Sequence, residues 1–207
     1  HLFLWYNYLG DFMNYQLELE KIINNLDGRK TLLLHSCCAP CSSYVITYLK
    51  DYFDITILYY NPNIEPIEEY NKRKEEQIRL CKLFNIKVLD CDYDNDLFHE
   101  TVLGLEKCKE GGSRCFKCYE LRLRKTASLA SNYDFFGTTL TVSPFKNSNK
   151  LNEIGLSLEK EYNVKYLVSD FKKKEGYKKS IILSKEYDLY RQDFCGCIYS
   201  KRDKIID

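Results

Sequence analysis

The stretch Leu32–Val45, LLLHSCCAPCSSYV, decides the fold expected for this chain. Its apolar first half ends at His35 and is typical of a short buried β-strand. Three cysteines follow: Cys37, Cys38 and Cys41. A helical pattern then begins and runs over about residues 41–51. The stretch therefore predicts a strand that passes into a helix, with three thiols at the junction.

The rest of the chain alternates between strand and helix patterns. Short runs rich in β-branched and aromatic residues predict strands at 31–35, 55–60, 86–90, 134–142 and 164–169. Helical periods predict helices at about 14–26, 41–51, 66–84, 95–107, 115–132, 148–162 and 177–189. This alternation predicts an α/β fold, a mostly parallel Rossmann-like sheet flanked by helices. We expect one catalytic domain over residues 31–207, preceded by an N-terminal extension, residues 1–30, that contains a helix.

Composition sets the class of protein but not its partners. The chain has 207 residues, of which 44% are hydrophobic and 29% charged, as in a soluble globular domain. It has no apolar run of about 18 residues, so we expect no membrane span. Without a signal-peptide pattern, we expect a cytoplasmic protein, and we expect Met13, the single methionine, to be the native start. The net charge of +1 excludes neither nucleic acid nor small substrates.

Cysteine is the most informative residue type in this composition. The chain has ten cysteines, and in a reducing compartment clustered thiols indicate metal binding or redox chemistry. Cys81, Cys91 and Cys108 stand alone and are expected to be ordinary thiols. The other seven form three groups: Cys37-Cys38-x-x-Cys41, Cys115-x-x-Cys118 and Cys195-Gly-Cys197. The first group follows the first strand, and parallel sheets bind ligands beyond the carboxyl ends of their strands.

Each group admits more than one chemistry. Cys38 and Cys41, with Ala39-Pro40 between them at a helix start, match a thioredoxin-type dithiol whose pKa the helix dipole would lower. That interpretation leaves Cys37 unexplained. Cys115 and Cys118 lie one helical turn apart, so both can face one metal. Spacing leaves zinc and iron–sulfur both open, and we favour iron–sulfur. The Cys-Gly-Cys pair permits a reducible disulfide, a thiol pair that passes electrons, or two further metal ligands.

Several segments together resemble a known family. They are LLLHSCCAPCSSYV, YNPNIEPIEEYNKR, RCFKCYELRLRKTA, FGTTLTVSPFKNSNKLNEIG and DFKKKEGYKKSIILSKEYDLYRQDFCGCIYS. In this order, from about Thr31 to Ser200, they resemble the cobalamin-independent epoxyqueuosine reductases, the QueH family. The closing segment with its Cys-Gly-Cys is the most specific of them.

The resemblance implies a function and a cofactor. It implies the last step of queuosine synthesis in tRNA, the two-electron reduction of epoxyqueuosine to queuosine at the wobble position. It also implies a HUP-like fold, a [4Fe-4S] cluster with an adjacent mononuclear iron, and an external electron donor. The residues that match the family's metal-binding cysteines are Cys37, Cys38, Cys41, Cys115 and Cys118. Cys195 and Cys197 match its C-terminal pair, for which we expect a redox role, and Cys41 is expected to serve the reaction as well.

One division of the ligands has a physical basis. Adjacent side chains tend to diverge, so we expect one member of the vicinal pair, Cys37 or Cys38, to join Cys115 and Cys118 on the cluster. The other member would reach the second iron with Cys41. An open position on that iron would act as a Lewis acid on the epoxide oxygen.

Substrate contacts are expected from polar residues at the strand ends and from basic runs. Asn61, Tyr70 and Arg73 match the family's NPN…EY…R pattern, and Lys146 follows the fourth strand. The runs at 72–74, 122–125 and 172–179, with Lys178 and Lys179, are candidates for phosphate contacts. A splayed wobble base would enter an aromatic pocket. Glu65 stands where many relatives have histidine and receives no role.

Two histidines and two other functions complete the expectations. His35 either orients the site or donates a proton, or is a hydrogen-bonded core histidine, and His99 is expected at the surface. A thioredoxin-like thiol–disulfide oxidoreductase and a zinc-stabilised RNA-binding module remain as alternatives to the reductase. The metal content distinguishes the three, because the reductase needs iron with sulfide, the dithiol enzyme no metal, and the RNA-binding module zinc.

Overall fold

The central element of the fold is a five-stranded sheet in which every pairing is parallel. The computed structural model describes residues 13–205, so residues 1–12 of the predicted extension (1–30) lie outside the described residues. The strands are β1 (Lys30–His35), β2 (Phe53–Leu58), β3 (Lys87–Leu89), β4 (Phe135–Thr138) and β5 (Lys165–Tyr166). Their order is β3-β2-β1-β4-β5, and this confirms the predicted α/β class.

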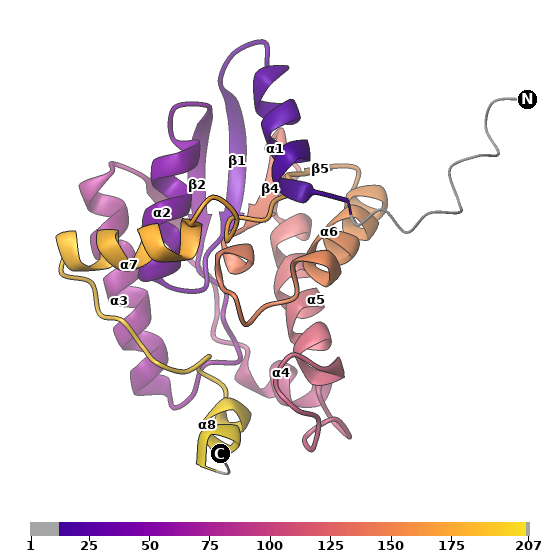
Figure 1. Cartoon of the computed structure of the whole chain (residues 1–207). Helices are drawn as coiled ribbons and strands as arrows, with labels where there is room; N and C mark the ends of the chain where they lie inside the picture. Colours follow the sequence, from indigo (N-terminus) through magenta and orange to yellow (C-terminus); the bar gives the residue numbers. More distant parts are fainter. Residues whose placement is uncertain (1–12, 206–207) are drawn as a thin grey trace, which may run out of the picture.

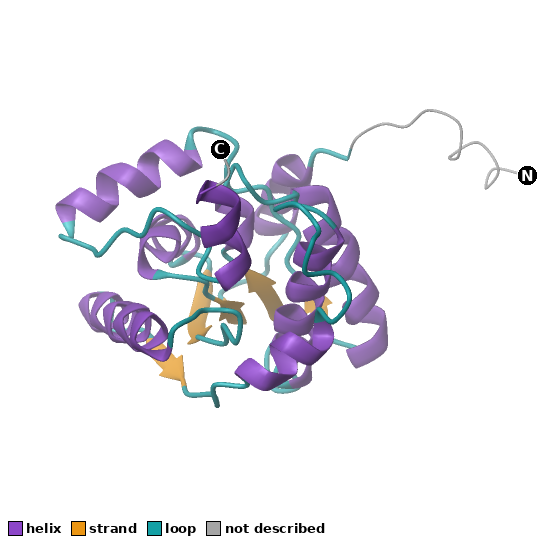
Figure 2. Cartoon of the chain, turned by 90° about the horizontal axis from the view of Figure 1, so that it is seen from below, coloured by secondary structure: helices purple, strands orange, loops and turns teal. Residues whose placement is uncertain are grey.

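Helices cover both faces of this sheet (Figures 1 and 2). They are α1 (Tyr15–Asn24), α2 (Ala39–Leu49), α3 (Ile67–Leu83), α4 (Asn95–Thr101), α5 (Ser113–Ser128), α6 (Ser148–Tyr162), α7 (Gly176–Glu186) and α8 (Ile198–Ile205). Helices α2 and α7 pack together on one side of the sheet, and α5 and α6 pack together on the other. Across residues 13–205, no helix is both long and apolar enough to cross a membrane.

The residues of β1 divide between two hydrophobic cores. Leu32 and Leu34 belong to the core beneath α2, whereas Leu33 belongs to the core beneath α5 and α6. This is the alternation of side chains along a strand, and because both faces are covered, the strand reads as a continuous apolar run. Leu19 and Ile23 of α1 join the first core. The domain boundary at residue 30 stays a prediction.

Some element boundaries differ from the predicted ones. The predicted strand 134–142 ends at Thr138 and continues as a 3₁₀ turn over Leu140–Val142. The Thr138 hydroxyl accepts a bond from the Leu140 amide at 3.1 Å and thereby turns the chain out of the sheet. The predicted helix 95–107 stops at Thr101, shortly before Gly104, whose φ of +79° a helix cannot continue. Helix α8 was not predicted.

The order of the strands reverses between β1 and β4, and this reversal positions the site. The chain leaves β1 towards β2 and β3 on one side, and later enters β4 and β5 on the other. The loops after β1 and β4 therefore face each other, and the Cys37 amide donates to the Thr139 hydroxyl at 3.3 Å. Crevices at such switch points are where parallel sheets bind ligands.

Candidate functional site

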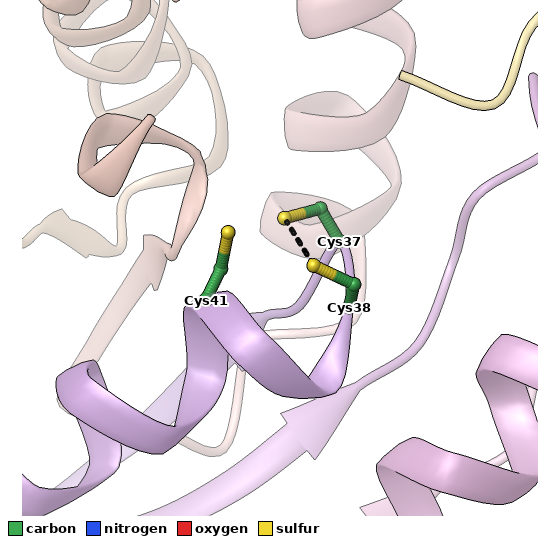
Figure 3. A group of neighbouring side chains, drawn as sticks. All are labelled: Cys37, Cys38 and Cys41. Carbon is green, nitrogen blue, oxygen red and sulfur yellow. Dashed lines mark hydrogen bonds between the residues drawn. The ribbon is translucent and has the colours of Figure 1, made fainter. Parts of the chain in front are cut away.

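Cys37, Cys38 and Cys41, here called the three-cysteine group, converge at the end of β1. Cys38 is the N-cap of α2 and is extended (φ −175°, ψ 158°), while Cys41 lies in the first turn of that helix. The three sulfurs lie within 4.8 Å of one another. Figure 3 shows the Cys37 and Cys38 sulfurs facing each other, 3.8 Å apart, with Cys41 on the same side. The expectation that the vicinal side chains diverge is therefore wrong, because the sharp turn from strand to helix redirects the chain between them.

The spacing of these sulfurs suits a soft metal. Two thiolates bound about 2.3 Å from one tetrahedral ion lie about 3.8 Å apart, which is the separation of Cys37 and Cys38. Cysteine sulfur is also the ligand that selects zinc, copper(I) and iron–sulfur centres over magnesium or calcium. The residues present therefore fit a thiolate-ligated metal centre.

Hydrogen bonding among the three thiols separates their pKa values. Bonds from the Cys37 and Cys41 thiols hold the pKa of Cys38 well below its usual range. The bond to Cys38 raises the pKa of Cys37 to about 11. Bonds to Cys37 and Cys38 and burial raise the pKa of Cys41 as well. Cys38 is thus the most easily ionised of the three thiols, and a metal that binds all three sulfurs as thiolates must displace their protons.

Cys115, Cys118, Cys195 and Cys197, here called the four-cysteine group, form a second gathering of thiols. They line a void of about 10 Å³ together with Arg122 and Lys146. The first pair lies in the opening turns of α5, and the second pair lies in the loop before α8. The two pairs are separate motifs in the sequence, and the fold brings them together.

A pocket of about 510 Å³ joins the two groups. All members of the three-cysteine group line it, and so does Cys195 of the four-cysteine group. Its walls also include Asn61, Arg73, Glu110, Arg122, Phe145, Lys146, Tyr177, Arg191 and Phe194. The volume lies in the range of small-molecule sites, about 300–1,000 Å³. The predicted residues Asn61, Arg73 and Lys146 are therefore in the pocket with the thiols.

Lys146 forms a buried pair with Cys195. Its Nζ lies 3.1 Å from the Cys195 sulfur and 3.2 Å from Glu110 Oε1. A hydrogen bond from Cys197, with the charges of Lys146 and Arg122, holds the pKa of Cys195 well below its usual range. The bond to Cys195 raises the pKa of Cys197. The loop therefore holds two neighbouring thiols, of which Cys195 is the more easily ionised, and this arrangement favours thiol redox chemistry.

Arg73 holds the Cys-Gly-Cys loop in place. It is 2% exposed and donates to the carbonyls of Cys195 at 3.1 Å and Phe194 at 3.5 Å. Glu69 pairs with its Nε at 2.6 Å. The guanidinium also lies 4.8 Å from the Phe194 ring centroid. Most of its polar contacts are thus made to the protein, and the expected contact with substrate stays a prediction.

Arg122 belongs to the basic run 122–125, for which the sequence predicts phosphate contacts, but the structure buries its side chain. The side chain is 2% exposed and lines both the pocket and the small void. Its neighbour Arg124 is on the outside and pairs with Glu161 and Glu120. A signal was present, because Arg122 follows Cys115 by seven positions and Cys118 by four, which places all three on one helix face.

The remaining predicted residues lie away from the pocket walls. Tyr70 packs in an aromatic cluster, with ring centroids 5.4 Å from Tyr59 and 4.4 Å from Tyr93. Lys178 pairs with Glu175 at 3.0 Å, and Lys179 lies 5.8 Å from the centroid of the Tyr44 ring. Their roles towards a substrate stay predictions.

The two histidines have different surroundings. His35 is fully buried, with Nε2 3.0 Å from the Tyr60 carbonyl and Nδ1 3.0 Å from the Thr138 hydroxyl. Burial lowers its pKa to about 3, so the ring is neutral. His35 therefore has the surroundings of a hydrogen-bonded core histidine, which is one of the two alternatives that the sequence left open. His99 is half-buried and lies 3.1 Å from Glu65.

The solitary cysteines stay outside both groups. Cys81 is buried in α3, where it accepts a bond from Gln77 at 3.2 Å, and burial raises its pKa to about 11. Cys91 and Cys108 are partly buried.

The fold and the site define a class of protein: a Rossmann-like α/β protein with a thiol-lined pocket at the switch point of its sheet. The family model described as epoxyqueuosine reductase QueH matches residues 32–203. A relative from Staphylococcus epidermidis with that name is 42% identical over 94% of this chain and 87% of its own length. One from Streptococcus pyogenes is 41% identical, over 92% and 78%. The chain belongs to the epoxyqueuosine reductase QueH family, as the resemblance indicated.

Solved structures with the same fold are more distant. The U34-tRNA thiolase NcsA from Methanococcus maripaludis, solved with its [4Fe-4S] cluster, has a TM-score of 0.55 and 14% identity. The match covers 90% of this chain and 67% of that one. A predicted subunit of tRNA methyltransferase from Methanocaldococcus jannaschii has a TM-score of 0.52 and 17% identity, covering 76% and 75%. These similarities support the HUP-like α/β fold.

Proposed function

We propose that this protein reduces epoxyqueuosine to queuosine at the wobble position of tRNA in the cytoplasm, with electrons from an external donor. Family membership makes the chain an oxidoreductase of queuosine biosynthesis. The observation that carries the site assignment is the single pocket that joins the two thiol groups. In the reaction the epoxide accepts two electrons and two protons. Both carbon–oxygen bonds of the ring break, a carbon–carbon double bond forms, and the oxygen leaves as water.

The proposed cofactors are a [4Fe-4S] cluster and an adjacent mononuclear iron, with Cys37, Cys38, Cys41, Cys115 and Cys118 as ligands. The donor set supports this, because the gathered ligands are thiols, which suit iron–sulfur centres. Because the sulfurs of the three-cysteine group lie so close together, we propose that this group binds as a unit, which replaces the division of the vicinal pair. When bound, the iron centres supply electrons and a Lewis acid for the epoxide oxygen.

The chain's own residues then bind the nucleoside and handle protons. Phe145, Tyr177 and Phe194 give the pocket aromatic walls for a base. Lys146 holds a proton on Nζ beside the Cys195 sulfur, and we expect it to supply one of the two protons. Cys195 and Cys197 would form a disulfide as they give up two electrons, and the external donor would reduce that disulfide again.

The basic residues Lys178 and Lys179 are proposed to contact tRNA phosphates, together with the run that precedes them. Such contacts would make tRNA affinity fall steeply as salt rises.

The test is a metal analysis followed by an assay. Protein purified without oxygen is analysed for iron, zinc and acid-labile sulfide, and its EPR spectrum is recorded after dithionite reduction. We expect about four or more irons per chain with matching sulfide. The protein should also convert epoxyqueuosine in isolated tRNA to queuosine. Zinc without sulfide would favour the RNA-binding module. No metal, even after reconstitution with iron and sulfide, would favour the dithiol of Cys38 and Cys41.

A further inference from the structure

Arg122 is a buried cation without a carboxylate partner among the described residues. Its Nε donates to the Cys118 carbonyl at 3.3 Å, and its Nη1 donates to Asn61 Oδ1 at 3.3 Å. Its Nη2 is buried and has no hydrogen-bond partner. A buried charge without an opposite charge is costly, and a buried donor without an acceptor adds to the cost. A negatively charged group other than a carboxylate side chain would therefore stabilise Arg122 at this position.

The groups that face Arg122 indicate where this charge resides. The thiols whose charge acts on Arg122 belong to three separate segments: Cys37 after β1, Cys118 on α5, and Cys195 before α8. The charge of Arg122 also lowers the pKa of His35, but the His35 ring is neutral. Its two nitrogens already bond to the Thr138 hydroxyl and the Tyr60 carbonyl. Tyr119, the remaining group, is a phenol with a pKa raised by burial, so it is also neutral. Among these thiols only Cys195 has a lowered pKa, whereas the pKa values of Cys37 and Cys118 are raised to about 11. Cys37 and Cys118 therefore add negative charge beside this guanidinium when they bind a metal as thiolates, because metal binding displaces their protons.

Arg122 also lies between the two thiol groups. It lines the pocket that contains the three-cysteine group and the void that contains the four-cysteine group. Through Asn61, which donates to the Ser36 carbonyl at 2.8 Å, it is connected to the loop that carries Cys37. One guanidinium is therefore positioned to act on the charge of both groups at once.

We propose that Arg122 is the built-in counter-charge of the thiolate-bound metal centre and that it raises the reduction potential of that centre. The inference rests on the proposed iron–sulfur cofactor. Reduction adds one negative charge to the centre, and a buried cation stabilises the reduced form more than the oxidised form. Arg122 is a positioning residue in this sense. It sets the electron affinity of the centre and need not touch the substrate.

The test compares variants on the same helix. Arg122→Gln keeps hydrogen-bonding capacity and removes the charge, Arg122→Lys keeps the charge, and Arg124→Gln removes an exposed charge two residues away. The reduced fraction of the cluster is measured by EPR at a series of fixed potentials on anaerobically purified protein. At the wild-type midpoint, we expect the ratio of reduced to oxidised cluster to fall at least about tenfold in Arg122→Gln, which corresponds to about 59 mV for one electron. Arg122→Lys and Arg124→Gln should remain near wild type.

Each outcome decides the matter. An unchanged midpoint in Arg122→Gln overturns the inference and leaves the cofactor proposal intact. A wild-type protein without a reducible cluster overturns the cofactor proposal and the inference together. Circular dichroism shows whether each variant is folded. If folded Arg122→Gln holds no cluster while Arg122→Lys holds one, charge compensation is supported. If both lose it and Arg124→Gln does not, shape rather than charge is what Arg122 supplies, and the inference is wrong.

Discussion

The three-cysteine group and the four-cysteine group are built in opposite ways. The first comes from one continuous stretch, and its geometry follows from a strand that turns directly into a helix. The second draws on α5 and on a loop near the other end of the described chain. Buried cations are its scaffold: Arg73 holds the loop carbonyls, while Lys146 and Arg122 face the thiols.

The difference teaches how a fold divides the work of building a site. A local group is formed as soon as its strand and helix are formed, so it is suited to be the fixed half of a metal centre. A group assembled from distant segments must overcome the entropy of closing a long loop, and it needs specific anchors. We therefore expect metal retention to depend on the three-cysteine group together with the proposed ligands Cys115 and Cys118, and the Cys-Gly-Cys loop to respond to changes in its anchors.

The largest effect is expected from losing a member of the three-cysteine group. Cys41→Ala should reduce iron and sulfide to background and abolish reductase activity, because the group is proposed to bind as a unit. Cys197→Ala should abolish activity but retain most of the iron, because Cys197 is proposed as a redox thiol and not as a ligand. Iron and sulfide per chain are counted on protein prepared without oxygen.

Cys81→Ala is the matched control for these variants, because Cys81 is a buried thiol outside both groups. It should keep its iron. If Cys41→Ala keeps as much iron as wild type, the proposal that the three cysteines bind metal as a unit is wrong. If Cys197→Ala loses as much as Cys41→Ala, the Cys-Gly-Cys pair is part of the metal site.

The next variant tests whether Arg73 anchors the Cys-Gly-Cys loop of the four-cysteine group. Arg73→Met removes a buried cation, leaves the Phe194 and Cys195 carbonyls without this donor, and breaks the ion pair with Glu69, to which the Tyr190 hydroxyl still donates. We expect the free energy of unfolding to fall by about 3–5 kcal/mol, as for other broken buried ion pairs. Urea unfolding followed by circular dichroism measures it.

Arg79→Met provides the comparison, since Arg79 lies on the same helix and pairs with Glu76 at 2.7 Å, but its side chain is 44% exposed. That variant should cost only about 1 kcal/mol. Equal losses in the two variants would contradict the anchoring role of Arg73.

The contrast between the groups also explains what the sequence could predict. The strand, the helix and the three thiols at their junction lie within residues 32–45, and local patterns determine them. The meeting of Cys115 and Cys118 with Cys195 and Cys197 depends on tertiary contacts, for which no local pattern exists. Arg122 was grouped with Arg124 and Lys125 because charge runs are usually solvated, and only its position relative to the cysteines of α5 separates it from them.

Element boundaries were less predictable for a similar reason. Apolar residues after Thr138 favoured a continued strand, but the side-chain bond between Thr138 and the Leu140 amide ends it. Strand β5 is only Lys165–Tyr166, although the apolar pattern extends to residue 169. The Leu167 amide still donates to the Phe136 carbonyl of β4 at 2.8 Å, but the Ser169 amide donates to a side chain, Asn152 Oδ1, at 3.0 Å.

A smaller effect is expected at the glycine between Cys195 and Cys197. Gly196 has φ +119°, and a Cβ there would lie 2.9 Å from Ile64 Cγ1 and 3.0 Å from Arg73 Nη1. Gly196→Ala should lower stability by up to about 3 kcal/mol and reduce activity while leaving iron in place. Gly104→Ala separates strain from crowding, because Gly104 also has positive φ (+79°) but open space around its Cβ position. It should cost about 1–2 kcal/mol without loss of activity, and an equal loss of activity in both would contradict the account.

The smallest effect concerns how each group is supported in acid. Beneath the three-cysteine group, His35 is buried neutral with its pKa lowered to about 3. Because the pKa in the unfolded chain is higher, about 6.5, the stabilising effect of neutral His35 is complete above that value and is lost as pH falls towards 3. Arg73 and Arg122, which lie beside the four-cysteine group, keep their charge throughout this range.

Between pH 8 and pH 5, protonation of His35 in the unfolded chain should therefore lower the free energy of unfolding by about 2 kcal/mol. His35→Gln removes this titration, so its free energy of unfolding should fall less over the same interval, although its stability at pH 8 is lower because the bonds to Tyr60 and Thr138 are disturbed. Urea unfolding of both proteins at the two pH values gives the difference, in which all other titrating groups cancel. Parallel losses in the two proteins would mean that His35 is not the acid-sensitive support of the local group, and that the two halves of the site do not differ in this respect.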